Sequence, residues 1–168
     1  MLLRHAKSSW DDPELSDHER TLTKRGTTDA PRVGGWMRDN GLVPQAVLCS
    51  GAVRARATLT LVLAALAGAA PAIAYDEALY LAEPGGILAR IGKVPAGVET
   101  LLVVGHNPGL QMLALSLAGG SDRKALAALA EKLPTAGLVV LEHDGAGWTP
   151  IPFGSCRLRS FVTPKRLA

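Results

Sequence analysis

The stretch Leu101–Pro108, which reads LLVVGHNP, decides the fold that we predict for this chain. Its four leading apolar residues form a short continuous run, as in a strand that is buried on both faces of a sheet. Gly105, His106 and Asn107 then lead into Pro108, and proline is favoured at the first position of a helix. The pattern therefore predicts a strand, a tight loop and a helix, the repeating unit of an α/β protein.

Similar units recur on both sides of this stretch. We expect further buried strands at residues 1–4, 46–49, 72–75 and 138–141, and an edge strand within the proline-containing segment 148–162. We expect helices at residues 23–40, 52–67, 84–91, 108–117 and 121–132, the last of them capped by Ser121. This alternation predicts an α/β protein, a three-layer α/β/α sandwich with a mostly parallel central sheet.

Composition limits the classes of protein that this chain can belong to. With 168 residues, of which 48% are hydrophobic and 20% charged, the chain suits a single globular domain that spans residues 1–168. Four of the 18 basic residues follow Cys156, where no acidic residue occurs, so residues 1–156 hold 14 basic and 15 acidic residues. This distribution does not predict nucleic-acid binding.

Targeting signals are not visible in the sequence. The apolar residues before Arg4 are too few for the core of a signal peptide, and the apolar run around residues 59–70 is too short to span a membrane. Cys49 and Cys156 are the only cysteines and form no paired motif. We therefore expect a cytoplasmic protein with reduced thiols and no membrane partner.

Chemistry-bearing residues follow three of the predicted strands. Arg4 and His5 end the first strand, Arg54 lies just after the second, and His106 follows the stretch quoted above. In a parallel sheet these strand ends meet at one edge, so two guanidinium groups and two imidazoles would surround one tetrahedral anion. A helix that opens at Pro108 would add backbone N–H groups. The sequence predicts a phosphate pocket, and no spacing in it is typical of a metal site.

Each of these residues has an expected role. Arg4 and Arg54 stay charged at physiological pH and could neutralise the phosphoryl oxygens. A neutral histidine can attack phosphorus directly, and His5 is the better nucleophile because a strand end aims it rigidly. We expect His106 to be a charged partner of the phosphoryl oxygens, its pKa held up by the bound dianion.

Some features leave alternatives open. Pro134 and Thr135 would lie at the far edge of the sheet if the strand at 138–141 is parallel, and at the pocket edge if it is antiparallel. Pro31 should kink its helix or reset the start of that helix. We assign His18 and His143 to surface or packing roles.

Five stretches of the sequence resemble a known family. They are LLRHAKS (2–8), LSDHERTLTKRG (15–26), CSGAVRARATLTL (49–61), VGHNPGL (104–110) and KLPTAGLVVLE (132–142). In this order they resemble the histidine phosphatase superfamily, also called phosphoglycerate-mutase-like, and most closely its SixA branch of phosphohistidine phosphatases. The resemblance runs from Leu2 to about Glu142.

The resemblance implies a phosphoglycerate-mutase-like fold and a role for each pocket residue. His5 would become phosphorylated and then be hydrolysed, while Arg4, Arg54 and His106 would hold the phosphoryl oxygens. The family uses no metal ion and no organic cofactor, so none is expected here.

Further residues are implied to bind substrate. Asp17 and Arg20 would lie near the pocket mouth, either contacting substrate or forming an ion pair between loop and sheet. Ser8 and Asn107 are the other substrate-binding candidates, placed behind the residues that touch phosphate.

One departure from the family pattern bears on the substrate. Larger members carry a glutamate general acid where this chain has Leu81. An alkoxide leaving group needs a proton, whereas the imidazole of phosphohistidine can depart neutral because unperturbed histidine has a pKa of about 6.5. The lack of the glutamate favours P–N cleavage, although Glu77 or Asp17 could serve as an acid in another position.

These observations define the expected function. The chain leaves no room for a cap inserted between strands, and an open pocket suits a phosphohistidine displayed on a protein, such as a phosphotransfer domain. We expect a metal-independent phosphatase for such a protein. The alternatives are a phosphomonoesterase for a small phosphorylated metabolite or phosphoprotein ester, and a non-catalytic phosphate-binding regulatory module.

Overall fold

The computed structural model describes residues 1–119, 122–145 and 147–167. The strands are β1 (Leu2–Arg4), β2 (Ala46–Ser50), β3 (Ala72–Asp76), β4 (Leu101–Gly105), β5 (Leu138–Glu142) and β6 (Arg157–Val162). The α-helices are α1 (Lys24–Asp39), α2 (Val53–Ala65), α3 (Pro84–Ile91), α4 (Gly109–Leu117) and α5 (Arg123–Glu131). Short 3₁₀ helices cover Asp17–Glu19, Glu77–Leu79 and Pro164–Arg166.

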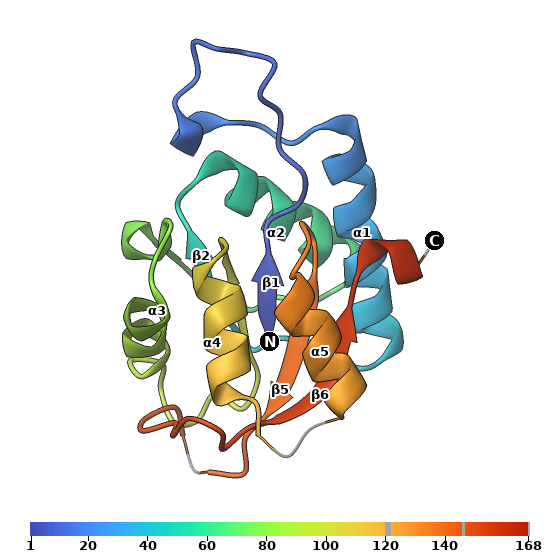
Figure 1. Ribbon diagram of the computed structural model, residues 1–168. Coiled ribbons are helices and arrows are strands. Elements are labelled where there is room, and N and C mark those ends of the chain that lie inside the picture. The colour runs from blue at the N-terminus through green and yellow to red at the C-terminus, as the bar shows by residue number, and fades with distance from the viewer. Residues whose placement is uncertain (120–121, 146, 168) are drawn as a thin grey trace.

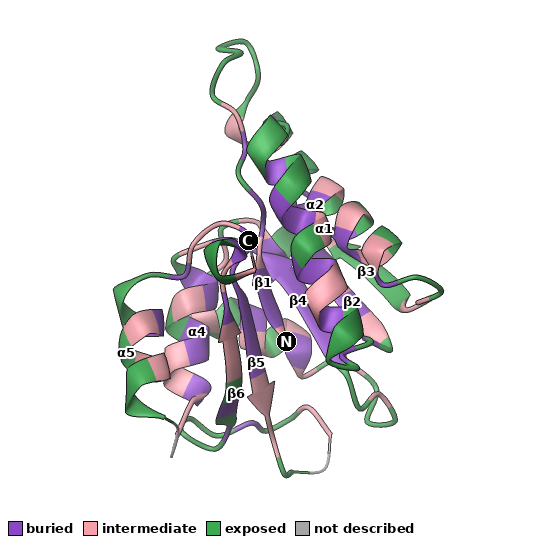
Figure 2. Ribbon diagram, turned by 90° about the vertical axis from the view of Figure 1, so that its right-hand side faces the viewer, coloured by how far each residue is buried: buried purple, intermediate pink, exposed green. Residues whose placement is uncertain are grey.

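The strands form one sheet with helices on both faces (Figure 1). Helices α1 and α2 pack on one face around a core that includes Leu3, Val47 and Leu102. Helices α3, α4 and α5 cover the other face over Val103 and Val139. Figure 2 shows the buried strands β1 and β4 between these layers. The predicted α/β/α sandwich is confirmed.

The strand order is β3-β2-β4-β1-β5-β6, and strand direction settles one open alternative. Strands β3, β2, β4 and β1 are parallel, whereas β5 is antiparallel to β1 and β6 is antiparallel to β5. The residues just before β5 therefore return to the carboxyl edge of the parallel strands. There Arg4 donates its backbone N–H to Gly137, and Ala136 donates to the carbonyl of His5.

Three local expectations need correction. β3 lies at the edge of the sheet and its residues 72–75 are exposed, so it is not a buried strand. Helix α1 runs continuously from Lys24 through Pro31, so the proline does not reset its start. Pro108 precedes helix α4 and is not its first residue. Ser121 lies outside the described residues, and Asp122 caps helix α5 through Lys124.

Helices α1 and α2 approach each other closely at a glycine. A Cβ at Gly34 would lie 2.5 Å from the carbonyl oxygen of Val62 and 2.9 Å from the Cβ of Ala65. Only a residue without a side chain allows this approach. The contact fixes α2, and with it the position of Arg54 in the first turn of that helix.

Candidate active site

His5 follows β1 and is held from both sides of its imidazole. Its Nδ1 lies 2.7 Å from the carbonyl oxygen of Ala6, which can only accept a hydrogen bond, so Nδ1 carries the proton. Its Nε2 accepts a hydrogen bond from Nε of Arg54 at 3.3 Å. The ring is therefore the tautomer whose Nε2 lone pair faces the guanidinium group, which suits it to attack an anion bound there.

Arg54 lies at the centre of the site. The residue is 2% exposed, and its Nη2 approaches Nδ1 of His106 at 3.4 Å. The His5 and His106 ring centroids are 5.1 Å apart. His106 donates from Nε2 to Oγ of Ser50 at 2.8 Å, since its Nδ1 accepts from Arg54. Three strand ends thus meet at one guanidinium group, as the sequence predicts.

Arg4 reaches the same edge from β1. Its Nη1 donates to the carbonyl oxygen of Leu133 at 2.8 Å, and its Nε is buried without a hydrogen-bond partner among the described residues. Burial lowers the pKa of Arg4, and the positive charge of Arg54 lowers it further. A buried cation, Arg54, and a half-buried one, Arg4, are suited to hold an oxyanion between them.

Both site histidines are neutral near pH 7. Burial, together with the charges of Arg54, Arg4 and Arg20, lowers the pKa of His5 to about 4, although the hydrogen bond to the backbone of Ala6 raises it. Burial, followed by the neighbouring His5 and Arg54, lowers the pKa of His106 to about 3. A charged His106 would therefore require the charge of a bound dianion.

Asp17 faces Arg54 from the 3₁₀ helix Asp17–Glu19. Its Oδ2 accepts from Nη2 of Arg54 at 2.9 Å and from the hydroxyl of Tyr80, and its Oδ1 accepts from Nη1 of Arg20 at 2.6 Å. Its carbonyl oxygen accepts from Nη1 of Arg54. The hydrogen bond from Tyr80, together with the two arginines, lowers the pKa of Asp17 to about 2. Asp17 is ionised at neutral pH and has no proton to donate.

Arg20 links Asp17 to the loop that follows β1. Its Nε donates to the carbonyl oxygen of Ser9 at 2.8 Å, and its Nη2 donates to Oγ of Ser8. Its guanidinium carbon lies 3.3 Å from the centroid of the Trp10 ring. Asp17 and Arg20 thus form an ion pair within one loop, not the expected ion pair between loop and sheet, and Ser8 supports this pair. Their expected contact with substrate stays a prediction.

Asn107 is turned toward the segment before β5. Its Nδ2 donates to the carbonyl oxygen of Leu133 at 3.1 Å and to Oε1 of Gln111 at 3.0 Å. It therefore shares the Leu133 carbonyl with Arg4. Its contacts position this segment, and its expected role in substrate binding stays a prediction.

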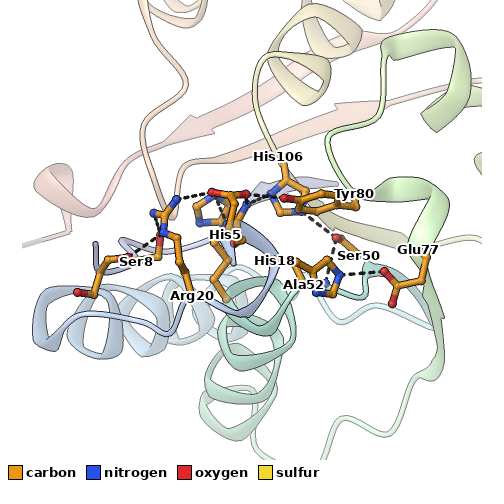
Figure 3. Close-up of polar contacts among 12 residues, drawn as sticks. His5, Ser8, His18, Arg20, Ser50, Ala52, Glu77, Tyr80 and His106 are labelled. Atoms are coloured by element: carbon orange, nitrogen blue, oxygen red, sulfur yellow. Dashed lines mark hydrogen bonds and ion pairs between the residues drawn. The ribbon is translucent and has the colours of Figure 1, made fainter. Parts of the chain in front are cut away.

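Several residues at the site were missed by sequence reasoning. Ser50 and Tyr80 make polar contacts at the site (Figure 3). His18, for which a surface or packing role is expected, contacts Glu77, which the sequence offers only as a possible acid in another position. Ser50 ends β2, and Glu77 and Tyr80 come just after β3, so the strand-end rule that selected His106 applies to them as well.

The remaining histidine, His143, lies apart from this site. His143 lines a cavity of about 610 Å³ near the opposite end of the sheet, together with Leu101 and Trp148. Within residues 1–119, 122–145 and 147–167, no group of three or more His, Cys, Asp and Glu residues is placed to hold a metal ion. In the same residues, no helix combines the length and the apolar character that crossing a membrane requires.

Known proteins of similar sequence and structure identify the family. An uncharacterised protein of Mycobacterium tuberculosis, Rv1276c, is 41% identical over 165 residues, which cover 97% of this chain and all of that protein. A candidate phosphohistidine phosphatase SixA from Agrobacterium tumefaciens is 30% identical in sequence to this chain. Its crystal structure aligns with a TM-score of 0.79, covering 97% of this chain and 96% of that chain. The chain belongs to the SixA branch of the histidine phosphatase superfamily.

A second solved structure agrees with this assignment. It is a candidate SixA from Nakamurella multipartitia, 28% identical, with a TM-score of 0.83 over 97% of this chain and 95% of that chain. No protein-family model matches the chain.

Proposed function

We propose that this chain is a phosphatase that works through a phosphorylated His5 and acts on protein phosphohistidine. The observation that carries the proposal is the state of His5: its buried Nε2 is unprotonated and lies 3.3 Å from Nε of Arg54. A nucleophile that is neutral at pH 7 and lies beside a permanent cation can attack a phosphoryl group without prior deprotonation.

The proposed reaction has two steps. In the first, Nε2 of His5 forms a bond to phosphorus while the substrate's P–N bond breaks, and the electron pair of that bond goes to the departing imidazole. In the second, a water oxygen bonds to phosphorus and the electron pair of the His5–phosphorus bond returns to Nε2, which releases phosphate. Arg4 and Arg54 neutralise the phosphoryl oxygens in both steps.

The residues available as acids favour phosphohistidine as the substrate. Leu81 occupies the position of the family's glutamate acid, and Asp17, with its pKa lowered to about 2, is ionised. An alkoxide would have to leave without a proton from either group, which raises the barrier for ester cleavage. An imidazole whose other nitrogen carries a proton leaves as a neutral ring, so its P–N bond can break without an acid beside the phosphorus-bound atom. A phosphotransfer domain is the kind of protein that displays such a group.

A trapping experiment tests the nucleophile. The enzyme is incubated with ³²P-phosphoramidate and quenched in base, where phosphohistidine survives and phosphoserine does not. We expect alkali-stable label on wild type and none on His5→Ala, while His106→Ala labels more slowly and on the same residue. Label on the His5→Ala variant would overturn the assignment.

A comparison of substrates tests the reaction class. We expect kcat/KM for phosphoramidate to exceed that for an alkyl phosphate by at least about 100-fold, the range typical of a missing general acid. Equal values would favour the phosphomonoesterase alternative. Phosphate binding without turnover of either compound would favour the regulatory binding module.

A further inference from the structure

A second pair of titratable groups lies at the mouth of the pocket, outside the residues used above. Nε2 of His18 lies 2.9 Å from Oε2 of Glu77. The two residues come from different 3₁₀ helices, Asp17–Glu19 and Glu77–Leu79, and Figure 3 shows their side chains turned toward each other. No hydrogen bond to another described residue engages Nδ1 of His18, which leaves this nitrogen able to exchange a proton.

Tyr80 connects this pair to the reaction centre. Its ring is edge-on to His18, with centroids 4.9 Å apart, and edge-on to His106, with centroids 5.3 Å apart. Its hydroxyl is bound to Asp17, so the ring is fixed in place. The ring of Tyr80 therefore lies between His18 and His106, which places His18 one aromatic ring away from His106.

A glycine without a side chain lies against the carboxylate of this pair. A Cβ on Gly51, just after β2, would overlap the carboxylate of Glu77. The absence of a side chain there lets Glu77 pack against the loop that leads to Arg54. An ordinary surface pair forms wherever two flexible side chains meet and contributes little. Here the backbone makes room for the carboxylate, and the carboxylate orients the imidazole.

The chemistry of phosphohistidine calls for a proton donor at this distance. When the P–N bond breaks, the departing ring is a neutral imidazole only if its other nitrogen, away from phosphorus, carries a proton. An ester needs its proton on the oxygen that is bonded to phosphorus. That oxygen lies closer to the phosphorus atom than the distal nitrogen of an imidazole does. A donor at the mouth suits the distal ring nitrogen, and Leu81 supplies no donor at the inner position.

We infer that His18, oriented by Glu77, is a further catalytic residue that protonates the distal nitrogen of the leaving imidazole. The inference rests on the proposed function. His18 enters the first step as an imidazolium, with the proton on Nε2 bound by Glu77 and a second proton on Nδ1. The second proton moves to the distal nitrogen while the P–N electron pair stays with the ring, and His18 becomes neutral. In the second step Nδ1 takes a proton from the attacking water. Asp17 cannot act in this way because it is ionised, and the Tyr80 hydroxyl is committed to Asp17.

Two matched substrates test this inference. N-Phosphoimidazole must gain a proton at its distal nitrogen, whereas N-phosphoryl-N′-methylimidazolium has a methyl group there and leaves neutral without one. We expect His18→Asn to lower kcat/KM for phosphoimidazole about 100-fold and to leave kcat/KM for the methylated compound within threefold. Glu77→Gln, which retains an oxygen acceptor, should give a smaller loss with the same selectivity.

The controls separate this inference from the proposed function. Glu14→Gln removes an exposed charge from the same loop and should change neither substrate. If His18→Asn lowers kcat/KM equally on both substrates, His18 has a structural role. If it lowers kcat/KM on neither, His18 has no role in the reaction. Either result overturns the inference. If wild type forms no phosphorylated His5 from either compound, the proposed function fails first.

Discussion

The buried residues of the site determine how the protein responds to acid. His5 and His106 are surrounded by apolar groups and by the charges of Arg4 and Arg54, so both stay neutral well below the usual range for histidine. This keeps the nucleophile ready at neutral pH. It also means that, between about pH 4 and 6, both histidines stay unprotonated in the folded protein but bind protons in the unfolded chain.

The first prediction concerns this acid response. The pKa of His5 is about 4 in the folded protein and about 6.5 in an unfolded chain, so the free energy of unfolding falls as pH drops from 6.5 toward 4. At pH 5 the loss from His5 is on the order of 2 kcal/mol. Urea unfolding at pH 7 and pH 5 should show a smaller drop for His5→Gln than for wild type. The same drop in both proteins would contradict the burial argument.

A second prediction concerns Asp17. Its carboxylate occupies donors of Arg54 and Arg20 that a phosphoryl dianion would also use. Asp17→Asn removes a negative charge from this position and keeps an oxygen acceptor. We expect inorganic phosphate to inhibit the variant at about tenfold lower concentration than wild type, measured as the competitive inhibition constant. Weaker inhibition would mean that Asp17 favours the bound anion.

Sequence reasoning at this scale succeeded where a residue follows a strand directly. Arg4, His5 and His106 could be placed together because the carboxyl ends of parallel strands share an edge. His18 could not, because its position depends on how the loop before α1 folds toward the residues that follow β3. His18 is separated from Glu77 by 59 residues, and no local pattern encodes that contact.

The helices and strands followed the sequence closely, and the exceptions have physical reasons. Residues 72–75 have the apolar character of an interior strand, but β3 is last in the sheet and has a partner on one side only. Pro31 lies inside α1 without resetting its start, so the tertiary packing of that helix outweighs the local penalty.

A third prediction compares two neighbouring glycines of α1. Gly34→Ala would force a Cβ against the carbonyl of Val62, 2.5 Å away, and should lower the free energy of unfolding by about 1–3 kcal/mol. Gly35→Ala meets only the end of the Arg38 side chain, 3.9 Å away, and should raise it by up to about 1 kcal/mol through helix propensity. Urea denaturation measures both, and equal effects would refute the close helix contact.

The sheet consists of a parallel part, β3-β2-β4-β1, and an antiparallel part, β5-β6. The sequence predicts the parallel part. The pattern of apolar runs predicted the three layers and the edge position of β6, which prolines precede. The sequence does not decide whether β5 is parallel or antiparallel to its neighbours, because an apolar run has the same pattern in either orientation. Only the register of β5 against β1 and β6 decides it.

A fourth prediction follows from the convergence of both halves on one anion site. Tungstate at 100 times its dissociation constant should stabilise the whole protein by about 2.7 kcal/mol, since it binds the folded state alone. This increment in stability should vanish in Arg54→Met and persist in Arg157→Met. In the wild type, Arg157 pairs with Glu142 on β5, away from the site. Thermal unfolding with and without tungstate measures the increment within each variant. An increment that survives in Arg54→Met would place the anion elsewhere.

The reversal of β5 has a consequence for how the enzyme is made. Arg4 and Asn107 share the carbonyl of Leu133, and the backbone of His5 bonds to Ala136, so the segment before β5 forms one wall of the pocket. A nascent chain halted on the ribosome at residue 132 would already carry both imidazoles and both guanidinium groups, yet it would lack that wall. Catalytic competence should therefore arise late in translation, after the first four strands have been synthesised.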